Sequence, residues 1–239
     1  MGAALGAYSS PVRSVLGSRD GINRPAGSPT AKDYIQDGLV AMWDGIENAG
    51  WGTHNSSATT WKDLLGGQEL EFSGTTVNAD SVGFVTGAYV YSNGNIGLTT
   101  ANTLQGEICI DIQSPPDNRQ YAQFAGSNTR IFALATRARG GISLVNGAAG
   151  YGDWPAGKHV LSAYWIDNVL HIDSELRETV TGTDTWSVRN KSTIIGDVVM
   201  NGSYGFTGNV HCIRLYSRAL TAAEIADNYA IDKKRFGLT

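Results

Sequence analysis

The stretch FTGNVHCIRLYSRALTAAEIADNY, residues 206–229, decides the fold class because it joins a strand pattern directly to a helix start. Its first half, Asn209–Tyr216, is a short run containing Val, Ile and Tyr, the composition of a β-strand. Its second half contains Thr221-Ala-Ala-Glu224, a capping box in which Glu224 stands three residues after the N-cap. We therefore expect the last strand of a β-rich domain to lead straight into a C-terminal helix.

The expected helix has an apolar face and a defined end. Leu220 and Ile225 occupy the two positions of a hydrophobic staple. The basic run 233–235 complements the dipole at the helix C-terminus, and Gly237 is suited to the left-handed conformation that ends a helix. The face expected to pack on a sheet comprises Ala222, Ile225, Ala226 and Tyr229.

Outward from this stretch, short apolar runs recur from Gly38 onward with turn residues between them. They are rich in Val, Ile, Tyr and Phe, and helical periodicity is almost absent. Asp167-Asn168 is suited to a two-residue hairpin turn between two of the runs. The runs are 39–43, 83–91, 106–112, 121–124, 130–136, 142–145, 159–166, 169–172, 192–196 and 209–216. This series predicts an all-β fold, a two-sheet antiparallel jelly-roll sandwich with one short C-terminal helix.

The closing motif resembles that of concanavalin A-like, laminin-G-like domains. It is carried by Gly208, Ile213, Arg214, Tyr216, Arg218, Leu220, Thr221, Glu224 and Ile225. The opening at 38–54 with 61–64 is similar to versions of the domain from gut bacteria and their phages, and the hairpin at 164–173 fits the middle of the pattern. The resemblance spans 38–238 and implies two antiparallel sheets in a jelly roll. Members of the family mostly bind glycans or protein surfaces and some relatives are glycoside hydrolases, so the fold alone does not choose among these functions.

Residues 1–33 differ from the rest of the chain and are expected to form an N-terminal arm. They include Pro11, Pro25 and Pro29 and few large apolar groups. Such a composition suits an anchor or linker rather than a core element. We therefore divide the chain into an arm at 1–33 and a sandwich domain at 34–239.

Composition excludes several classes of partner. The formal net charge is −4, which argues against nucleic acid because phosphate binding needs a clustered basic surface. No run reaches the roughly 20 apolar residues of a membrane span, and the N-terminus lacks the basic start and long apolar run of a signal peptide.

The two cysteines, Cys109 and Cys212, each lie in a strand-like run. We expect two buried thiols, with a disulfide between neighbouring strands as the alternative. No Cys-x-x-Cys spacing for a metal is present.

A catalytic constellation is not expected. Retaining glycosidases need two carboxylates about 5 Å apart, which alternate positions on one strand can supply. Glu107 and Asp111 have the wrong spacing, and Asp173 and Glu175 flank what reads as a turn at Ser174. The four histidines, His54, His159, His171 and His211, are scattered along the chain. The sequence therefore predicts a protein that is not an enzyme.

A calcium ion is the cofactor that the resemblance allows, since many relatives hold one with loop oxygens. The candidate ligands are Asp44, Glu47 and Asp63, with Asn48 beside them. Calcium takes six to eight oxygen ligands, and no Asp-rich loop of fixed spacing supplies them. Capping of the loops by these side chains is the favoured interpretation.

Aromatic side chains in loops are the candidate glycan contacts, because sugars stack on aromatic rings while polar groups recognise their hydroxyls. We assign Trp43, Trp61 and Trp165 to packing. The alternative for each loop tryptophan is a plug over the edge of the sandwich. The candidate binding residues are Trp51, His54, Asn55, Tyr151, Asp153, Trp154 and Trp186.

These observations favour a non-enzymatic recognition domain, with a cell-surface glycan as its partner. We expect display on a phage virion as a head fibre, decoration or tail component, with 1–33 docked on a capsid or tail protein. A homo-oligomer is expected, with a trimer as the first candidate. The alternatives are a capsid-stabilising protein without a ligand, a lectin-like module on the bacterial surface, and a diverged glycoside hydrolase.

Overall fold

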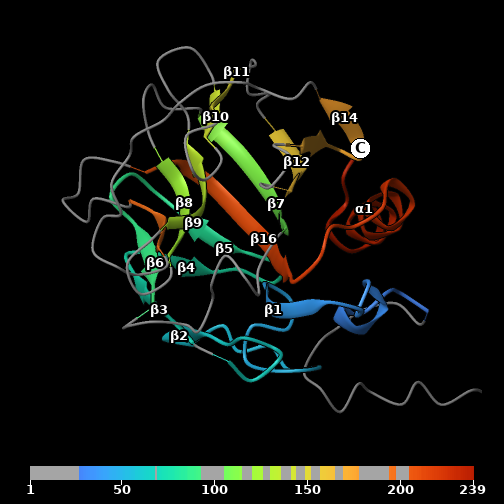
Figure 1. Ribbon diagram of the computed structural model, residues 1–239. Helices are drawn as coiled ribbons and strands as arrows, with labels where there is room; N and C mark the ends of the chain where they lie inside the picture. Colours follow the sequence, from blue (N-terminus) through green and yellow to red (C-terminus); the bar gives the residue numbers. More distant parts are fainter. Residues whose placement is uncertain are drawn as a thin grey trace, which may run out of the picture.

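Two antiparallel β-sheets face each other in the computed structural model, and a helix covers the outer face of the larger sheet (Figure 1). The structure describes residues 27–67, 69–92, 105–114, 120–125, 130–135, 141–143, 149–151, 157–164, 169–177, 194–197 and 205–239. Within these residues the chain is mostly β, as the sequence predicts. Two antiparallel sheets with one C-terminal helix are the architecture that the sequence predicts.

The larger sheet is built around β16 (Thr207–Tyr216), the strand quoted from the sequence above. In spatial order its strands are β14 (Glu175–Arg177), β13 (Val169–Ile172), β12 (Gly157–Tyr164), β7 (Gln105–Ser114), β16, β5 (Val82–Phe84) and β4 (Thr76–Val77). β1 (Leu39–Asp44) shares the second edge of β16 with β5. A bulge between Val210 and Cys212 separates the two halves of β16 that these strands pair with.

The smaller sheet closes the other side of the core. Its order is β2 (Thr60–Trp61), β3 (Leu70–Ser73), β6 (Tyr89–Tyr91), β15 (Ile194–Gly196), β8 (Gln120–Ala125) and β9 (Arg130–Ala135). A separate hairpin pairs β10 (Gly141–Ser143) with β11 (Ala149–Tyr151).

The structure divides the run at 83–91 between the two sheets. Its beginning belongs to β5 in the larger sheet and its end to β6 in the smaller one. The turn between them contains Gly87, whose φ is 85°. This left-handed backbone conformation is open to glycine but costly for other residues, so the chain can cross between sheets there.

The main core lies between the two sheets and contains side chains from both. Ile108, Ile110 and Ile213 come from the larger sheet, and Val90 and Ile195 from the smaller one. Trp43 and Trp61 are fully buried in this core, which confirms their assignment to packing. Trp165 lies outside the described residues.

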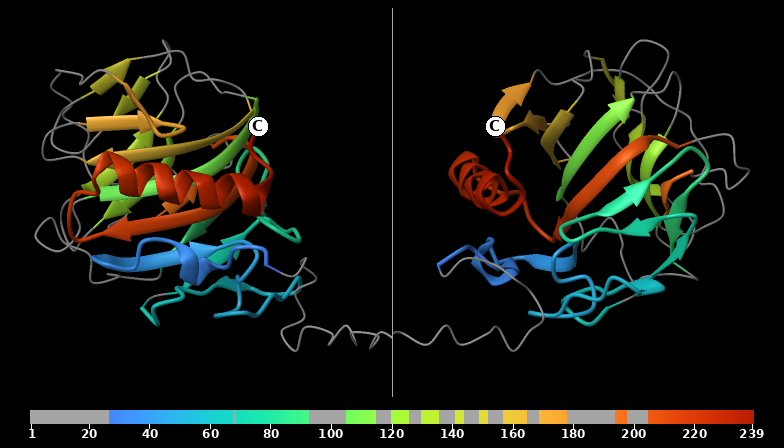
Figure 2. Two further views of the ribbon diagram at one scale, coloured as in Figure 1. Left: turned by 90° about the vertical axis from the view of Figure 1, so that its right-hand side faces the viewer. Right: turned by 180° about the vertical axis from the view of Figure 1, so that it is seen from behind.

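The helix α1 (Ala222–Phe236) lies across the outer face of the larger sheet (Figure 2, left). Both halves of the predicted capping box are present, since Glu224 N–H donates to Thr221 Oγ1 at 3.2 Å and Thr221 N–H donates to Glu224 Oε2 at 2.8 Å. Gly237 ends the helix in the left-handed conformation, and its N–H donates to the Lys233 carbonyl. Both ends of the helix are therefore confirmed.

The predicted buried face of α1 is only partly right. Ile225 is buried, but Ala222 and Ala226 are exposed. The buried positions further along the helix are Asn228, Asp232 and Phe236. Polar side chains occupy this face because the sheet beneath it carries a buried arginine, described below.

Two further predictions concern local pairing. β12 and β13 form the expected antiparallel hairpin, with Tyr164 opposite Val169, while the turn at 165–168 lies outside the described residues. Asp173 and Ser174 make the next turn, with φ of 52° and 66°. Two successive positive φ values are typical of a tight hairpin turn, as expected for Ser174.

Cys109 and Cys212 are buried and free, and they stand opposite each other on β7 and β16. The prediction of two buried thiols is confirmed. They lie in a second cluster, beneath α1, together with Ala31, Tyr34, Met42 and Phe236.

Residues just before β1 also pack under α1. The short 3-10 helix η1 (Ala31–Asp33) begins at the N-cap Thr30, and Ala31 and Tyr34 are buried. Thr30–Asp33, which the sequence analysis grouped with the arm, therefore contacts the sandwich. No helix among the described residues has the length and hydropathy needed to cross a bilayer.

Candidate functional site

The candidate site is the loop between β1 and β2, residues 45–59, which carries three of the predicted binding residues. Its ends are close, because Trp61 donates an indole N–H to the Asp44 carbonyl at 2.9 Å. In mid-loop, Asn48 donates to the Asn55 carbonyl at 2.9 Å and accepts from Asn55 N–H at 2.8 Å. Compact surface loops of this Ω type, held by their own side chains, frequently carry function.

Asp44 holds the start of this loop. Its Oδ1 accepts hydrogen bonds from the N–H groups of Ile46 at 3.0 Å and Glu47 at 2.9 Å. The same oxygen accepts from Arg235 Nη2 at 2.9 Å. Burial raises the pKa of the Asp44 carboxyl, and the Arg235 guanidinium opposes that rise. The carboxylate is thus committed to structure.

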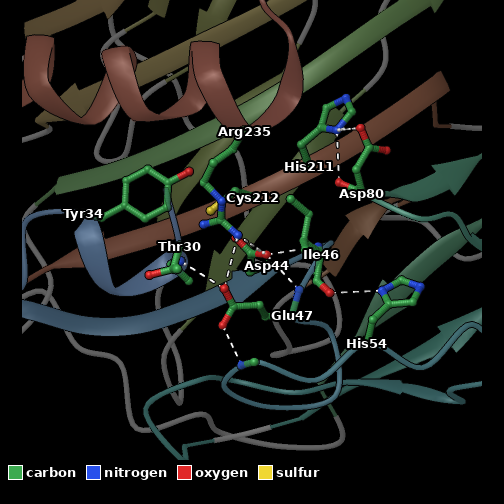
Figure 3. Close-up of polar contacts among 12 residues, drawn as sticks. Thr30, Tyr34, Asp44, Ile46, Glu47, His54, Asp80, His211, Cys212 and Arg235 are labelled. Carbon is green, nitrogen blue, oxygen red and sulfur yellow. Dashed lines mark hydrogen bonds and ion pairs between the residues drawn. The ribbon is translucent and has the colours of Figure 1, made fainter. Parts of the chain in front are cut away.

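Glu47 joins three separate segments (Figure 3). Its Oε2 accepts from Gly52 N–H at 2.7 Å, beside Trp51 in the loop. Its Oε1 accepts from Ala31 N–H at 3.0 Å and lies 3.5 Å from Arg235 Nη2. Glu47 therefore ties the Trp51 turn to η1 and to the end of α1.

Arg235 is the buried cation of this group. Its guanidinium lies over the ring of Tyr34, with 5.3 Å from the Cζ to the ring centroid. Burial lowers the pKa of Arg235, but nearby groups, Asp44 and Glu47 among them, raise it by a larger amount. The net shift is therefore upward. Arg235 therefore stays charged and does more than complement the helix dipole: it pins α1 to the loop.

The three loop residues from the sequence analysis differ in exposure. Trp51 is half-buried against the cluster beneath α1, and Lys32 Nζ lies 5.4 Å from its ring centroid. His54 Nδ1 is 3.1 Å from the Ile46 carbonyl oxygen, which can only accept, so Nδ1 carries a hydrogen and Nε2 of the neutral ring can accept one. Asn55 is exposed, and its Oδ1 accepts from Ser57 N–H at 2.9 Å.

The remaining predicted contacts fall where the structure describes no side chains. Tyr151 ends β11, and nothing is described of its side chain. Asp153, Trp154 and Trp186 lie outside the described residues.

The third calcium candidate, Asp63, also binds backbone amides. Its Oδ1 accepts from Met42 N–H at 2.9 Å and Leu65 N–H at 3.0 Å, and its Oδ2 accepts from Gly67 N–H at 3.0 Å. These contacts, like those of Asp44, agree with the loop-capping interpretation. The described part of the chain contains no group of three or more His, Cys, Asp or Glu side chains placed to hold a metal ion.

A buried polar cluster between β16 and α1 was missed by the sequence analysis. Arg214, on β16, is fully buried and donates to Glu107 Oε2 from Nε at 2.9 Å. It also makes two hydrogen bonds to Asp232 on α1, and Asn228 donates to Glu107 at 2.8 Å. Tyr34 donates its hydroxyl to Asp232 at 2.6 Å. The sequence contained a signal for the burial of Arg214. It alternates along β16 with Cys212 and Tyr216, so the three side chains lie on one face of the strand.

Burial determines what this cluster can do. Burial raises the pKa of the Glu107 carboxyl, and the neighbouring Arg214 guanidinium opposes part of that rise. Because Glu107 and Asp232 are buried between the larger sheet and α1 and are paired with Arg214, they hold the helix on the sheet.

A histidine–carboxylate pair lies at the start of β12 and in the turn that follows β13. His159 Nδ1 lies 2.6 Å from Asp173 Oδ2, and Asp173 Oδ1 accepts from Val160 N–H at 2.9 Å. The pair joins β12 to the turn at Asp173. Both of its members were noted from the sequence, but their pairing was not.

Comparisons with known proteins agree with this architecture. Residues 114–226 match the family model of the concanavalin A-like lectin/glucanases superfamily. The curated protein sequences give no match. Trypanosoma rangeli sialidase in complex with sialic acid aligns with 82% of this chain and 33% of its own, at 16% identity and a TM-score of 0.56. The binding domain of botulinum neurotoxin serotype D aligns with 81% of this chain and 52% of its own, at 13% identity and a TM-score of 0.55.

The chain thus spans about a third of the length of the sialidase chains that it matches, which is 33% in the complex with sialic acid. Likeness at such low identity concerns the fold. The two facing sheets and the similarity of residues 114–226 to that superfamily together indicate a concanavalin A-like fold.

Proposed function

We propose that this domain is a non-enzymatic recognition module that binds a glycan through the loop at 45–59. The observation that carries the proposal is the way this loop is built. Buried side chains satisfy its backbone, while Trp51, His54 and Asn55 remain at least partly accessible. A loop already fixed in one conformation loses little conformational entropy when a ligand binds.

The accessible groups have the chemistry that a sugar needs. The Trp51 ring offers an apolar face, His54 Nε2 can accept a hydrogen bond from a hydroxyl, and the Asn55 amide can donate one. The superfamily includes lectins, and the sialidase of similar fold is a complex with sialic acid. These facts support glycan recognition.

A binding role fits the four buried carboxylates of the two clusters better than hydrolysis does. Asp44, Glu47, Glu107 and Asp232 are buried and paired with arginine. A general acid or nucleophile of a glycosidase must reach the glycosidic bond. We therefore propose that the domain binds its sugar without cleaving it.

A glycan array with the full chain tests the proposal. We expect Trp51→Ala to abolish binding to the glycans that the wild type retains, because the stacking surface is lost. Val85→Ala is the matched control, since Val85 is an exposed apolar residue outside the loop. Binding that survives Trp51→Ala unchanged, or release of reducing sugar from a bound glycan, contradicts the proposal.

We further propose that residues 1–33 anchor the domain to a larger particle, with a phage virion as the first candidate and a bacterial surface as the second. Support comes from the Pro-rich composition of the arm and from η1, which fixes the end of this segment to the domain. Removal of residues 1–26 should abolish co-sedimentation with virions and leave glycan binding intact.

Light scattering on the full chain tests the proposed homo-oligomer, for which a trimer is the first candidate. Multivalent display would compensate for weak single sites.

A further inference from the structure

Lys32 is held in a fixed place beside the candidate loop. Thr30 caps η1, its Oγ1 accepting from Lys32 N–H at 3.2 Å. The preceding residue, Ala31, is buried and donates its N–H to Glu47 Oε1 at 3.0 Å. The backbone at Lys32 is therefore held by its own N–H and by that of Ala31, while its side chain is exposed.

The Lys32 ammonium is available to a ligand. It lies over the Trp51 ring at 5.4 Å from the centroid, and in the described part of the chain it has no carboxylate partner. Lys62, the lysine at the far end of the loop, differs because its Nζ lies 3.6 Å from Glu69 Oε1. The attraction between an ammonium group and a partly exposed ring is weak, and a carboxylate can replace it with a stronger charge-assisted hydrogen bond.

The loop itself supplies no competing charge. Residues 48–61, NAGWGTHNSSATTW, contain no Asp, Glu, Lys or Arg. Asp44 and Glu47 are buried beneath the loop and bound to Arg235, and Asp33 accepts from Thr30 N–H at 2.6 Å. Lys32 is thus the cation that a ligand on the Trp51 ring would meet.

From this arrangement we infer that the loop selects acidic sugars, with Lys32 binding the carboxylate while Trp51 stacks on the ring of the same residue. This inference rests on the proposed function and names its ligand class. A neutral sugar would have to displace the ammonium from the indole face without compensation. A uronic or other acid sugar would draw the ammonium to its own carboxylate. Lys32 is therefore the specificity-determining residue.

The experiment compares polygalacturonate oligomers with their methyl esters, which keep the sugar backbone and remove the charge. Apparent Kd values are measured by biolayer interferometry on the full chain at low salt. We expect the wild type to prefer the acid form, Lys32→Ala to lose about tenfold in affinity for that form alone, and Lys32→Arg to restore most of it. Lys62→Ala is the matched control and should change neither Kd.

The possible results separate the two proposals. Equal binding of acid and ester, or a preference that survives Lys32→Ala, overturns the inference and leaves glycan recognition standing. If neither oligomer binds and the array retains only neutral glycans, the inference is again overturned while glycan recognition stands. An array without any retained glycan overturns both.

Discussion

Arg214 and Asp232 form a doubly hydrogen-bonded ion pair between β16 and α1, with Nη1–Oδ1 at 2.8 Å and Nη2–Oδ2 at 2.6 Å. Both side chains are fully buried, so neither charge has water as an alternative partner. The pair joins the strand and the helix that the chain places next to each other in sequence.

Asp232→Asn should destabilise the domain strongly, because it leaves the buried Arg214 short of one negative partner. Loss of one member of a buried ion pair costs about 3 to 5 kcal/mol. Urea unfolding followed by tryptophan fluorescence measures the change. Asp227→Asn, the same substitution at an exposed position of α1, is the control and should cost less than about 0.5 kcal/mol. Equal losses in the two variants would rule out the pairing as the cause.

Glu224 should make stability depend on pH in the acid range. Hydrogen bonds from Arg218 and from the helix N-terminus lower the pKa of Glu224 from 4.5 to about 2. The folded state therefore favours the ionised form, and this stabilisation is present above about pH 4.5 and is lost as the pH falls toward 2. The difference in Tm between wild type and Glu224→Gln should shrink steadily over that range. Arg218→Ala should reduce the same pH dependence, and a difference that stays constant with pH refutes the assignment.

Cys109 and Cys212 should be inert toward thiol reagents in the folded protein. Burial under α1 raises the pKa of both thiols, and only the thiolate reacts. We expect DTNB to label them at the rate of unfolding in the wild type and faster in Asp232→Asn, where α1 is held less firmly. Single Cys→Ser variants identify which thiol reacts. Rapid labelling of the native wild type would show that α1 does not cover them.

Asn48→Ala should loosen the candidate loop without changing the core. It removes both hydrogen bonds to Asn55, and the expected signature is faster amide exchange across residues 49–58. Mass spectrometry of exchanged peptides measures it. Asn78→Ala is the control, because Asn78 also makes side-chain hydrogen bonds but lies outside the loop. The same protection in both variants means that Asn48 is not what holds the loop.

The parts of the fold that the sequence predicts are those governed by neighbouring residues. The capping box at Thr221 and Glu224 and the terminal Gly237 are local features, so they could be located without knowing the rest of the chain. The burial of Trp43 and Trp61 followed from their strand context and from the resemblance.

Long-range pairing explains what was missed. Arg214 meets Glu107 only because β16 and β7 pair in one register, which no local pattern specifies. Without that partner, Asn228 and Asp232 read as solvent-facing residues, and alanines were assigned to the buried face of α1 in their place. The same distinction applies to the site. Trp51, His54 and Asn55 are close in sequence and could be grouped from it. Lys32 lies beside Trp51 only because η1 packs against the domain, so its proximity could not be predicted.

The link between Glu47, Ala31 and Arg235 has a mechanical consequence for a tethered module. It fastens the entry segment and the last helix to the same loop, so a pulling force applied across the two ends of the domain meets these contacts first. Tyr34 and Asp232 lie in the same path. Stretching would therefore begin by peeling η1 and α1 from the sheet, and the Trp51 turn would lose its support before either sheet opened. A ligand held on that turn would be released under tension while the sandwich stayed folded.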